Sequence, residues 1–288
     1  MKRLNYFARG IYMVPRFNTD IVGAIVQADC RGAPYEEMKD LYIQRNVFEV
    51  NLDAPVYRIM ELQYLREDLV EKCLTYTKID KSNWGDSSEN PLLDREFKDD
   101  VTGGPLTLGV VTTVYGSCWS ATALDALSDW AIFSRRNPSV RVQSTPRKLL
   151  DAAMSRDNKF YMLQHFIGKM QYATNVEIEA YFSDPNWEKH LDSLGQGIAA
   201  SFLRLNNNLS SEDEVRLLYD HTDEAWPKIN VRIVDRFAKV PFDWLAAVDG
   251  VVVGPFVSDE DEAIVRSELQ GFGINCAVSS SPTRTSVG

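Results

Sequence analysis

The sequence predicts an α+β fold in which helices flank a mixed or mostly antiparallel sheet. Short runs rich in Val, Ile and Thr, typical of strands, recur along the chain, and amphipathic runs typical of helices lie between them. Their order is irregular and contains no repeated βαβ unit, which argues against a parallel sheet. The 288 residues are 44% hydrophobic and 25% charged, an ordinary balance for a globular protein with a full core.

The chain divides into an N-terminal part and a main domain. Residues 1–53 show no clean period and are interrupted by Pro15, Gly23, Gly32 and Pro34, so we expect an extension packed on the main body. Residues 54–288 form the main α+β domain.

The first half of the main domain opens with a strand entered through Pro55, because proline is tolerated at a strand start. The helix after it places Leu62, Leu65, Leu69 and Val70 on one face. The segment LGVVTTVYGSCW, rich in Val and Thr, is the clearest strand. In chain order we expect a strand at 54–60, a helix at 61–72, a strand at 74–77, a loop at 80–91, a mobile connection at 92–105 and a strand at 108–119.

The second half contains two helices with clear start signals. Thr145 and Pro146 match an N-cap and a first helical position. Ser258 caps a last helix whose acidic first turn suits the helix dipole. Segment 192–204 stays ambiguous between helix and strand. The other expected elements are a helix at 124–133, a strand at 139–144, a helix at 146–154, a strand at 167–172, a helix at 175–182, and strands at 214–219, 229–234 and 248–256.

Composition argues against several classes of protein. The net charge of -10 disfavours non-specific binding to a phosphate backbone. No segment approaches the roughly 18 apolar residues that cross a bilayer, and no signal peptide is evident, so we expect a cytoplasmic protein without membrane contact. The four cysteines and three histidines are scattered along the chain. We therefore expect neither a disulfide framework nor a metal site.

The motifs of common hydrolase and nucleotide sites are missing: there is no GxSxG, no GxxxxGK and no GxGxxG after a strand. A nuclease-like site could use Asp184, Glu188 and Lys189, but these residues crowd into one loop where a hairpin with wider spacing is needed. Three short segments remain as the candidate site, VYR at 56–58, SCWS at 117–120 and EDE at 212–214.

At these segments the chain resembles a bacterial family catalogued as domain of unknown function 2971. That family carries, in order, a VYR-like strand, a loop like WGDSSEN, an SCW segment with a downstream Trp, an RVQST-like strand and an EDEVRLLY-like strand. The downstream Trp is Trp130 in this chain. The resemblance covers residues 54–280 and implies no biochemical function.

A second, more distant resemblance concerns chemistry. An Arg on a first strand, a Ser on a second and a Glu-x-Glu pair are similar to the Arg-Ser-Glu arrangement of ADP-ribosyltransferases, glycosyl-transferring enzymes that use NAD. The resemblance implies an ADP-ribosyltransferase-like core in which Arg58 holds the NAD phosphate or ribose and Ser117 supports the site. It also implies that Glu214 grips the nicotinamide ribose and Glu212 directs the acceptor. Small bacterial enzymes of this kind often act as toxins in toxin–antitoxin or anti-phage systems, which implies a protein or nucleic-acid acceptor and an antitoxin partner.

The carboxylates fit this chemistry on physical grounds. Cleavage of the nicotinamide–ribose bond generates an oxocarbenium-like cation, which a carboxylate such as Glu214 stabilises as the charge develops. Side chains two apart on a strand share a face, so we expect Glu212 and Glu214 in one cleft, at a partly exposed strand start, with Asp213 pointing away. Close carboxylates raise one another's pKa, which would let Glu212 exchange a proton at neutral pH.

The remaining residues fit a dinucleotide. Arg58 offers a planar fork for a pyrophosphate or ribose, and Tyr57, Trp119 and Trp130 offer aromatic faces for nicotinamide or adenine. NAD is then a substrate, and no metal is needed. Two other interpretations stay open, a non-catalytic ligand-binding or regulatory domain and a nucleotide-cleaving hydrolase that uses the same pocket.

Overall fold

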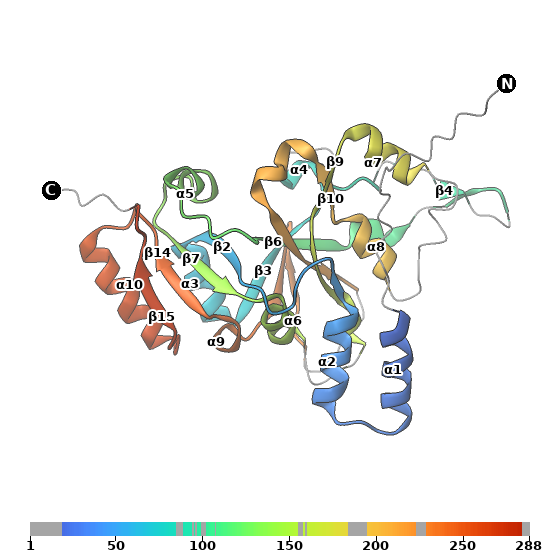
Figure 1. Cartoon of the computed structure of the whole chain (residues 1–288), viewed down its shortest axis with the longest axis horizontal. Helices are drawn as coiled ribbons and strands as arrows, with labels where there is room; N and C mark the ends of the chain where they lie inside the picture. Colours follow the sequence, from blue (N-terminus) through green and yellow to red (C-terminus); the bar gives the residue numbers. More distant parts are fainter. Residues whose placement is uncertain are drawn as a thin grey trace.

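The computed structural model describes residues 19–84, 89–93, 95, 97–98, 102–106, 108–154, 158, 160–183, 195–222 and 229–283. Over these residues the protein is an α+β structure, in which helices flank a mixed, mostly antiparallel sheet (Figure 1). This confirms the predicted fold class. The nuclease-like segment at 184–189 lies outside the described residues.

The helices carry the start signals that the sequence predicts at two places. The Thr145 side chain accepts a hydrogen bond from the Lys148 backbone N–H, and Ser258 does the same for Asp261. The described helices are α1 Thr19–Cys30, α2 Tyr35–Arg45, α3 Leu62–Glu71, α4 Lys81–Trp84, α5 Leu127–Ser134, α6 Pro146–Ala153, α7 Asn175–Phe182, α8 Gln196–Ser201, α9 Trp244–Ala247 and α10 Asp259–Gly271, with 3-10 segments η1 Gly109–Thr112, η2 Tyr161–Gln164 and η4 Asn207–Glu212.

The main sheet has the strand order β1-β8-β11-β6-β2-β7-β14-β15, and β3, β13 and β12 branch from it at β6. Its described pairings are antiparallel except β1 with β8 and β14 with β15. The strands are β1 Val47–Phe48, β2 Val56–Glu61, β3 Cys73–Lys78, β4 Phe97–Lys98, β5 Pro105–Leu106, β6 Val114–Ser120, β7 Ser139–Ser144, β8 His165–Lys169, β9 Gln171–Ala173, β10 Arg204–Asn206, β11 Glu214–Asp220, β12 Arg232–Val234, β13 Phe237–Pro241, β14 Gly250–Val253 and β15 Ala277–Ser280.

The N-terminal part contributes to this main body. Helices α1 and α2 lie side by side at the bottom of the view in Figure 1, whereas α10 and β15 lie at its left end. Residues of both helices, among them Ile25 and Tyr42, belong to the main hydrophobic core. Strand β1 adds an edge to the sheet beside β8. A domain boundary at residue 53 stays a prediction.

Several elements differ from the sequence-based expectation. The run 108–119 is a 3-10 segment followed by β6, and the Asn90 side chain donates to the carbonyls of Ile79 and Val111 beside it. Segment 192–204 contains the short helix α8 and the start of β10. The sequence predicted no helix or strand at α1, α2, β1, β13, α9 or β15, and it predicted a loop where α4 lies. Residues 92–105, predicted as a connection, contain β4 and the start of β5. Val70, expected on the apolar face of α3, is 68% exposed.

Strand β6 is the scaffold of the candidate site. On one side it pairs with β11 along its whole length, from Val114 to Ser120. On the other side it pairs with β3 at Tyr115 and Gly116, and with β2 only at Ser120. Residues 117–119 therefore have no strand partner on that side among the described strands. The sheet is split there.

Candidate functional site

A cleft of about 450 Å³ opens at this split in the sheet. It brings together all three segments singled out from the sequence. The lining residues are Tyr57, Arg58 and Ile59 from β2, Thr77 from β3, Asn83 and Trp84 from α4, residues 116–120 from β6, Leu124, Phe133 and Arg135 around α5, and Glu212 and Glu214 at the start of β11.

A hydrogen bond across the split joins β2 to β6. The guanidinium of Arg58 donates to the Ser117 hydroxyl at 2.7 Å, and the indole N–H of Trp119 donates to the same oxygen at 3.2 Å. Arg58 is half-buried and also lies in the electrostatic field of Asp68. Burial raises the pKa of Asp68, while hydrogen bonds from Thr75 and the charge of Arg58 oppose that rise. The Arg58 guanidinium at the base of the cleft is therefore held in place by its hydrogen bond to the Ser117 hydroxyl.

The alternation of side chains along the strands places Arg58 and Glu214 on different faces of the sheet. Arg58 shares its face of β2 with Val56 and Met60, which belong to the main core. On β11, Val215 and Leu217 face that same core, so Glu214 faces the other side. Both groups line one cleft because the split lets it reach through the sheet.

The two glutamates reach the cleft by a backbone route that the sequence did not predict. Glu212 ends the segment η4, and Asp213 has left-handed backbone with φ of 44° before β11 begins. Strand alternation therefore does not apply to Glu212. The Asp213 carboxylate points elsewhere, to Lys169 at 2.8 Å and to Thr122 at 3.1 Å. The expected convergence is present, but the turn at Asp213 produces it.

Glu214 is committed to a buried ion cluster. Its side chain is 3% exposed, which corrects the expectation of a partly exposed position. Both carboxylate oxygens accept from Arg216, at 2.7 and 3.0 Å, and Arg216 in turn lies 2.9 Å from Glu89. Burial lowers the pKa of Arg216, but Glu214 and Glu89 outweigh it and keep the guanidinium charged. The Trp84 ring lies 4.7 Å from that guanidinium and forms a wall of the cleft.

Glu212 has the more reactive environment of the two. It is half-buried, and among the described residues none donates a hydrogen bond or forms an ion pair with its carboxylate. Burial, followed by the charge of Glu214, raises its pKa above the usual range, against a smaller opposite effect of Arg216. A carboxylate with a raised pKa in a cleft is suited to proton transfer or to charge stabilisation. The neighbouring Cys118 is less suited to act as a nucleophile, because burial raises its pKa well above the usual range.

The aromatic residues separate into two groups. Tyr57, Trp84 and the exposed Phe133 line the cleft with accessible ring surface. Trp119 also lines it but is only 2% exposed. Trp130 is fully buried beneath Gly254, packs with Ile59 and Leu124, and does not line the cleft. Its expected role in stacking on a ligand ring is therefore corrected, because no face of the indole reaches the cleft.

Sequence reasoning missed Trp84, Phe133, Arg135, Arg216 and Glu89. Arg216 carried a signal, because it follows Glu214 by two residues on a strand and so shares its face. Arg135 lies at the rim, is exposed, and has no ion-pair partner among the described residues. Nothing local marked it, since its place follows from left-handed backbone at the end of α5.

Two general features bear on the chemistry. The described residues contain no group of three or more His, Cys, Asp or Glu side chains arranged to hold a metal ion. None of the described helices has both the length and the apolar character required to cross a bilayer.

No protein-family model matches the sequence, so the resemblance to domain of unknown function 2971 is not confirmed. No curated protein matches it significantly. Among solved structures, the fold is similar to DarT of Thermus sp. 2.9 in complex with ADP-ribosylated ssDNA, with 12% identity and a TM-score of 0.36 over 81% of this chain and 96% of that chain. A structure of the same DarT in complex with NAD+ matches over the same shares, with 12% identity and a TM-score of 0.33.

Proposed function

We propose that the cleft binds NAD and that the protein is an ADP-ribosyltransferase in which Glu212 is the carboxylate nearest to the chemistry. The observation that carries the proposal is the presence, in one cleft of about 450 Å³, of Arg58, Ser117 and a half-buried Glu212 whose carboxylate has no partner among the described residues. That volume is in the usual range for a small-molecule site.

The cleft offers a group for each part of a dinucleotide. Arg58 at the base and Arg135 at the rim supply positive charge for a pyrophosphate, in a protein whose net charge is otherwise -10. Tyr57, Trp84 and Phe133 supply ring faces for the bases.

The contacts of the two glutamates support a different division of roles from the one that the resemblance implied. Glu214 gives both oxygens to Arg216, so its main effect on the cleft is through the charge it places beside Glu212. Glu212 has a carboxylate available to the developing oxocarbenium cation. We therefore assign to Glu212 the stabilising role that the sequence suggested for Glu214. The acceptor, protein or nucleic acid, and an antitoxin partner remain part of the proposal.

One observation favours a second candidate, a non-catalytic binding domain. Arg58 and Glu214 already have protein partners at 2.7 Å, which is an arrangement that also serves structure alone. Such a domain would bind NAD or another nucleotide and leave it intact. A nucleotide-cleaving hydrolase would release nicotinamide without labelling an acceptor.

The experiment combines calorimetry with NAD and an assay of nicotinamide release. The purified full chain is incubated with adenylate-labelled NAD and a bacterial lysate, and label on protein and on nucleic acid is counted separately. We expect Glu212→Gln to slow nicotinamide release by about 10²- to 10⁴-fold while NAD binding changes little. Glu67→Gln, an exposed carboxylate on α3 outside the cleft, is the matched control and should behave as wild type.

Each outcome has a distinct meaning. NAD binding without release of nicotinamide would identify a binding domain, and release without labelled acceptor would identify a hydrolase. A protein that neither binds nor cleaves NAD, or a Glu212→Gln variant as active as wild type, would refute the proposed mechanism. Because ionised Glu212 is the proposed stabiliser, the rate should also rise with pH through the raised pKa of Glu212.

A further inference from the structure

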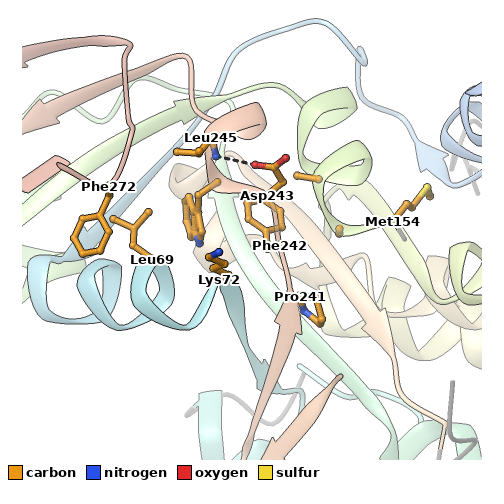
Figure 2. A pocket seen from close by; sticks show the side chains of 11 residues that line it. Leu69, Lys72, Met154, Pro241, Phe242, Asp243, Leu245 and Phe272 are labelled. Carbon is orange, nitrogen blue, oxygen red and sulfur yellow. Dashed lines mark hydrogen bonds between the residues drawn. The ribbon is translucent and has the colours of Figure 1, made fainter. Parts of the chain in front are cut away.

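A second cavity, of about 410 Å³, shares no lining residue with the cleft. It lies between α3, the end of α6, the β13–α9 connection and the end of α10. Figure 2 shows Leu69 and Phe272 on one side, Met154 on the other, and Lys72 and Phe242 between them. Nothing in the proposed function uses this cavity.

Its walls are mainly apolar, and one wall is rigidly held. The Phe242 and Trp244 rings pack edge to face with centroids 5.0 Å apart. The indole N–H of Trp244 donates to the Cys73 carbonyl at 2.7 Å, which fixes the orientation of the ring. A preformed apolar cavity of this size with few polar groups is typical of a small-molecule site.

Lys72 is the feature that indicates what kind of molecule fits. It is exposed at the mouth of the cavity and forms no ion pair among the described residues. The adjacent Glu71 is engaged by Arg232 at 2.6 Å and by Lys239 at 2.7 Å. The Asp243 carboxylate accepts from the backbone N–H groups of Leu245 and Ala246. The ammonium group of Lys72 is therefore available to an anion.

The backbone at Lys72 is a second, independent observation. Lys72 ends α3 with left-handed backbone, φ 51° and ψ 47°, where glycine is the usual residue because it lacks a Cβ. A strained non-glycine residue at a cavity mouth points to a use for its side chain.

We propose that this cavity binds a small apolar monocarboxylate, with the carboxylate on Lys72 and the apolar part between Leu69, Phe242 and Phe272. The charge of Lys72 selects the anion, and the ring surfaces select the apolar part. The site is separate from the cleft, so the proposal holds or fails independently of the proposed function.

The test uses the full chain and two probes of equal length, octanoate and 1-octanol, titrated by calorimetry. Lys72→Met should weaken octanoate binding by about fivefold or more and leave 1-octanol binding unchanged, because only the charge contact is lost. Lys72→Gly should also weaken octanoate binding, yet raise the midpoint of thermal unfolding, because it relieves the left-handed strain. Lys81→Met, at an exposed lysine outside the cavity, is the matched control.

Leu245→Asp adds a negative charge to the wall of the cavity and should weaken the binding of octanoate. The Leu245 side chain is 57% exposed, so this change should not unfold the protein. Absence of octanoate binding, or equal binding by wild type and Lys72→Met, would overturn the proposal. So would sedimentation showing a dimer that Leu245→Asp dissociates, since the cavity would then be an interface between copies of the chain.

Discussion

Replacing Glu214 by Gln should destabilise the protein more than any other conservative change in the cleft. The carboxylate is 3% exposed and accepts from Arg216 at 2.7 and 3.0 Å. Gln keeps one acceptor oxygen but turns an N–H group toward the guanidinium, so one charge-assisted hydrogen bond becomes a contact between two donors. The loss of such a bond costs about 1.5 to 3 kcal/mol.

The full penalty of an unpaired buried charge, about 3 to 5 kcal/mol, is not expected, because Arg216 keeps Glu89 as a partner at 2.9 Å. We therefore expect the free energy of unfolding to fall by about 2 to 3 kcal/mol. Urea denaturation followed by circular dichroism measures it.

Glu212→Gln is the matched control, since it makes the same chemical change two residues away. Glu212 is half-buried, has no hydrogen-bond donor among the described residues, and has a pKa raised by burial and by Glu214. Removing its charge should leave the free energy of unfolding within about 0.5 kcal/mol of wild type, or raise it. Equal unfolding free energies for the two variants would refute the assignment of Glu214 to a buried ion cluster.

Two further predictions concern the core. Burial lowers the pKa of His165 from 6.5 to about 3, so the unfolded chain binds a proton on acidification that the folded chain does not, and stability is lost as pH falls below 6.5. Between pH 7.5 and 5, the free energy of unfolding measured in urea should fall by about 2 kcal/mol more in wild type than in His165→Phe. If the unfolding free energies of the two proteins change in parallel with pH, the prediction is wrong. In Gly254→Ala, the new Cβ would lie 2.7 Å from the Trp130 ring and 2.8 Å from the Ser139 carbonyl oxygen, so thermal unfolding should show a loss of about 1 to 3 kcal/mol. The control is Gly23→Ala in α1, where a new Cβ meets nothing within 4 Å, so this change should be neutral or stabilising. If Gly254→Ala is as stable as Gly23→Ala, the prediction is wrong.

Local sequence signals were sufficient for the fold class and for many elements of the main domain. The predicted strand at 139–144 and helix at 175–182 match β7 and α7, because periodicity and capping residues act within one element. The N-caps at Thr145 and Ser258 form as expected for the same reason. Strand β13 was missed because its short run ends in proline and is held by pairing with β3, far away in the chain.

The candidate site was also predicted in part by the sequence and decided in part by the tertiary structure. The sequence by itself selected Arg58, Ser117 and the two glutamates, because their residue types suit the chemistry of a dinucleotide and an oxocarbenium cation. Only the tertiary structure decided which of them are available. Whether a polar or aromatic side chain is free depends on its neighbours in the fold: Arg216 holds Glu214 only two residues away, but Glu89 comes to Arg216 from a distant segment, and Ile59, Leu124 and Gly254 cover Trp130. Hydrophobic periodicity reports which face of an element is buried, whereas hydrogen-bond and ion-pair partners are fixed by contacts between strands, which periodicity does not encode.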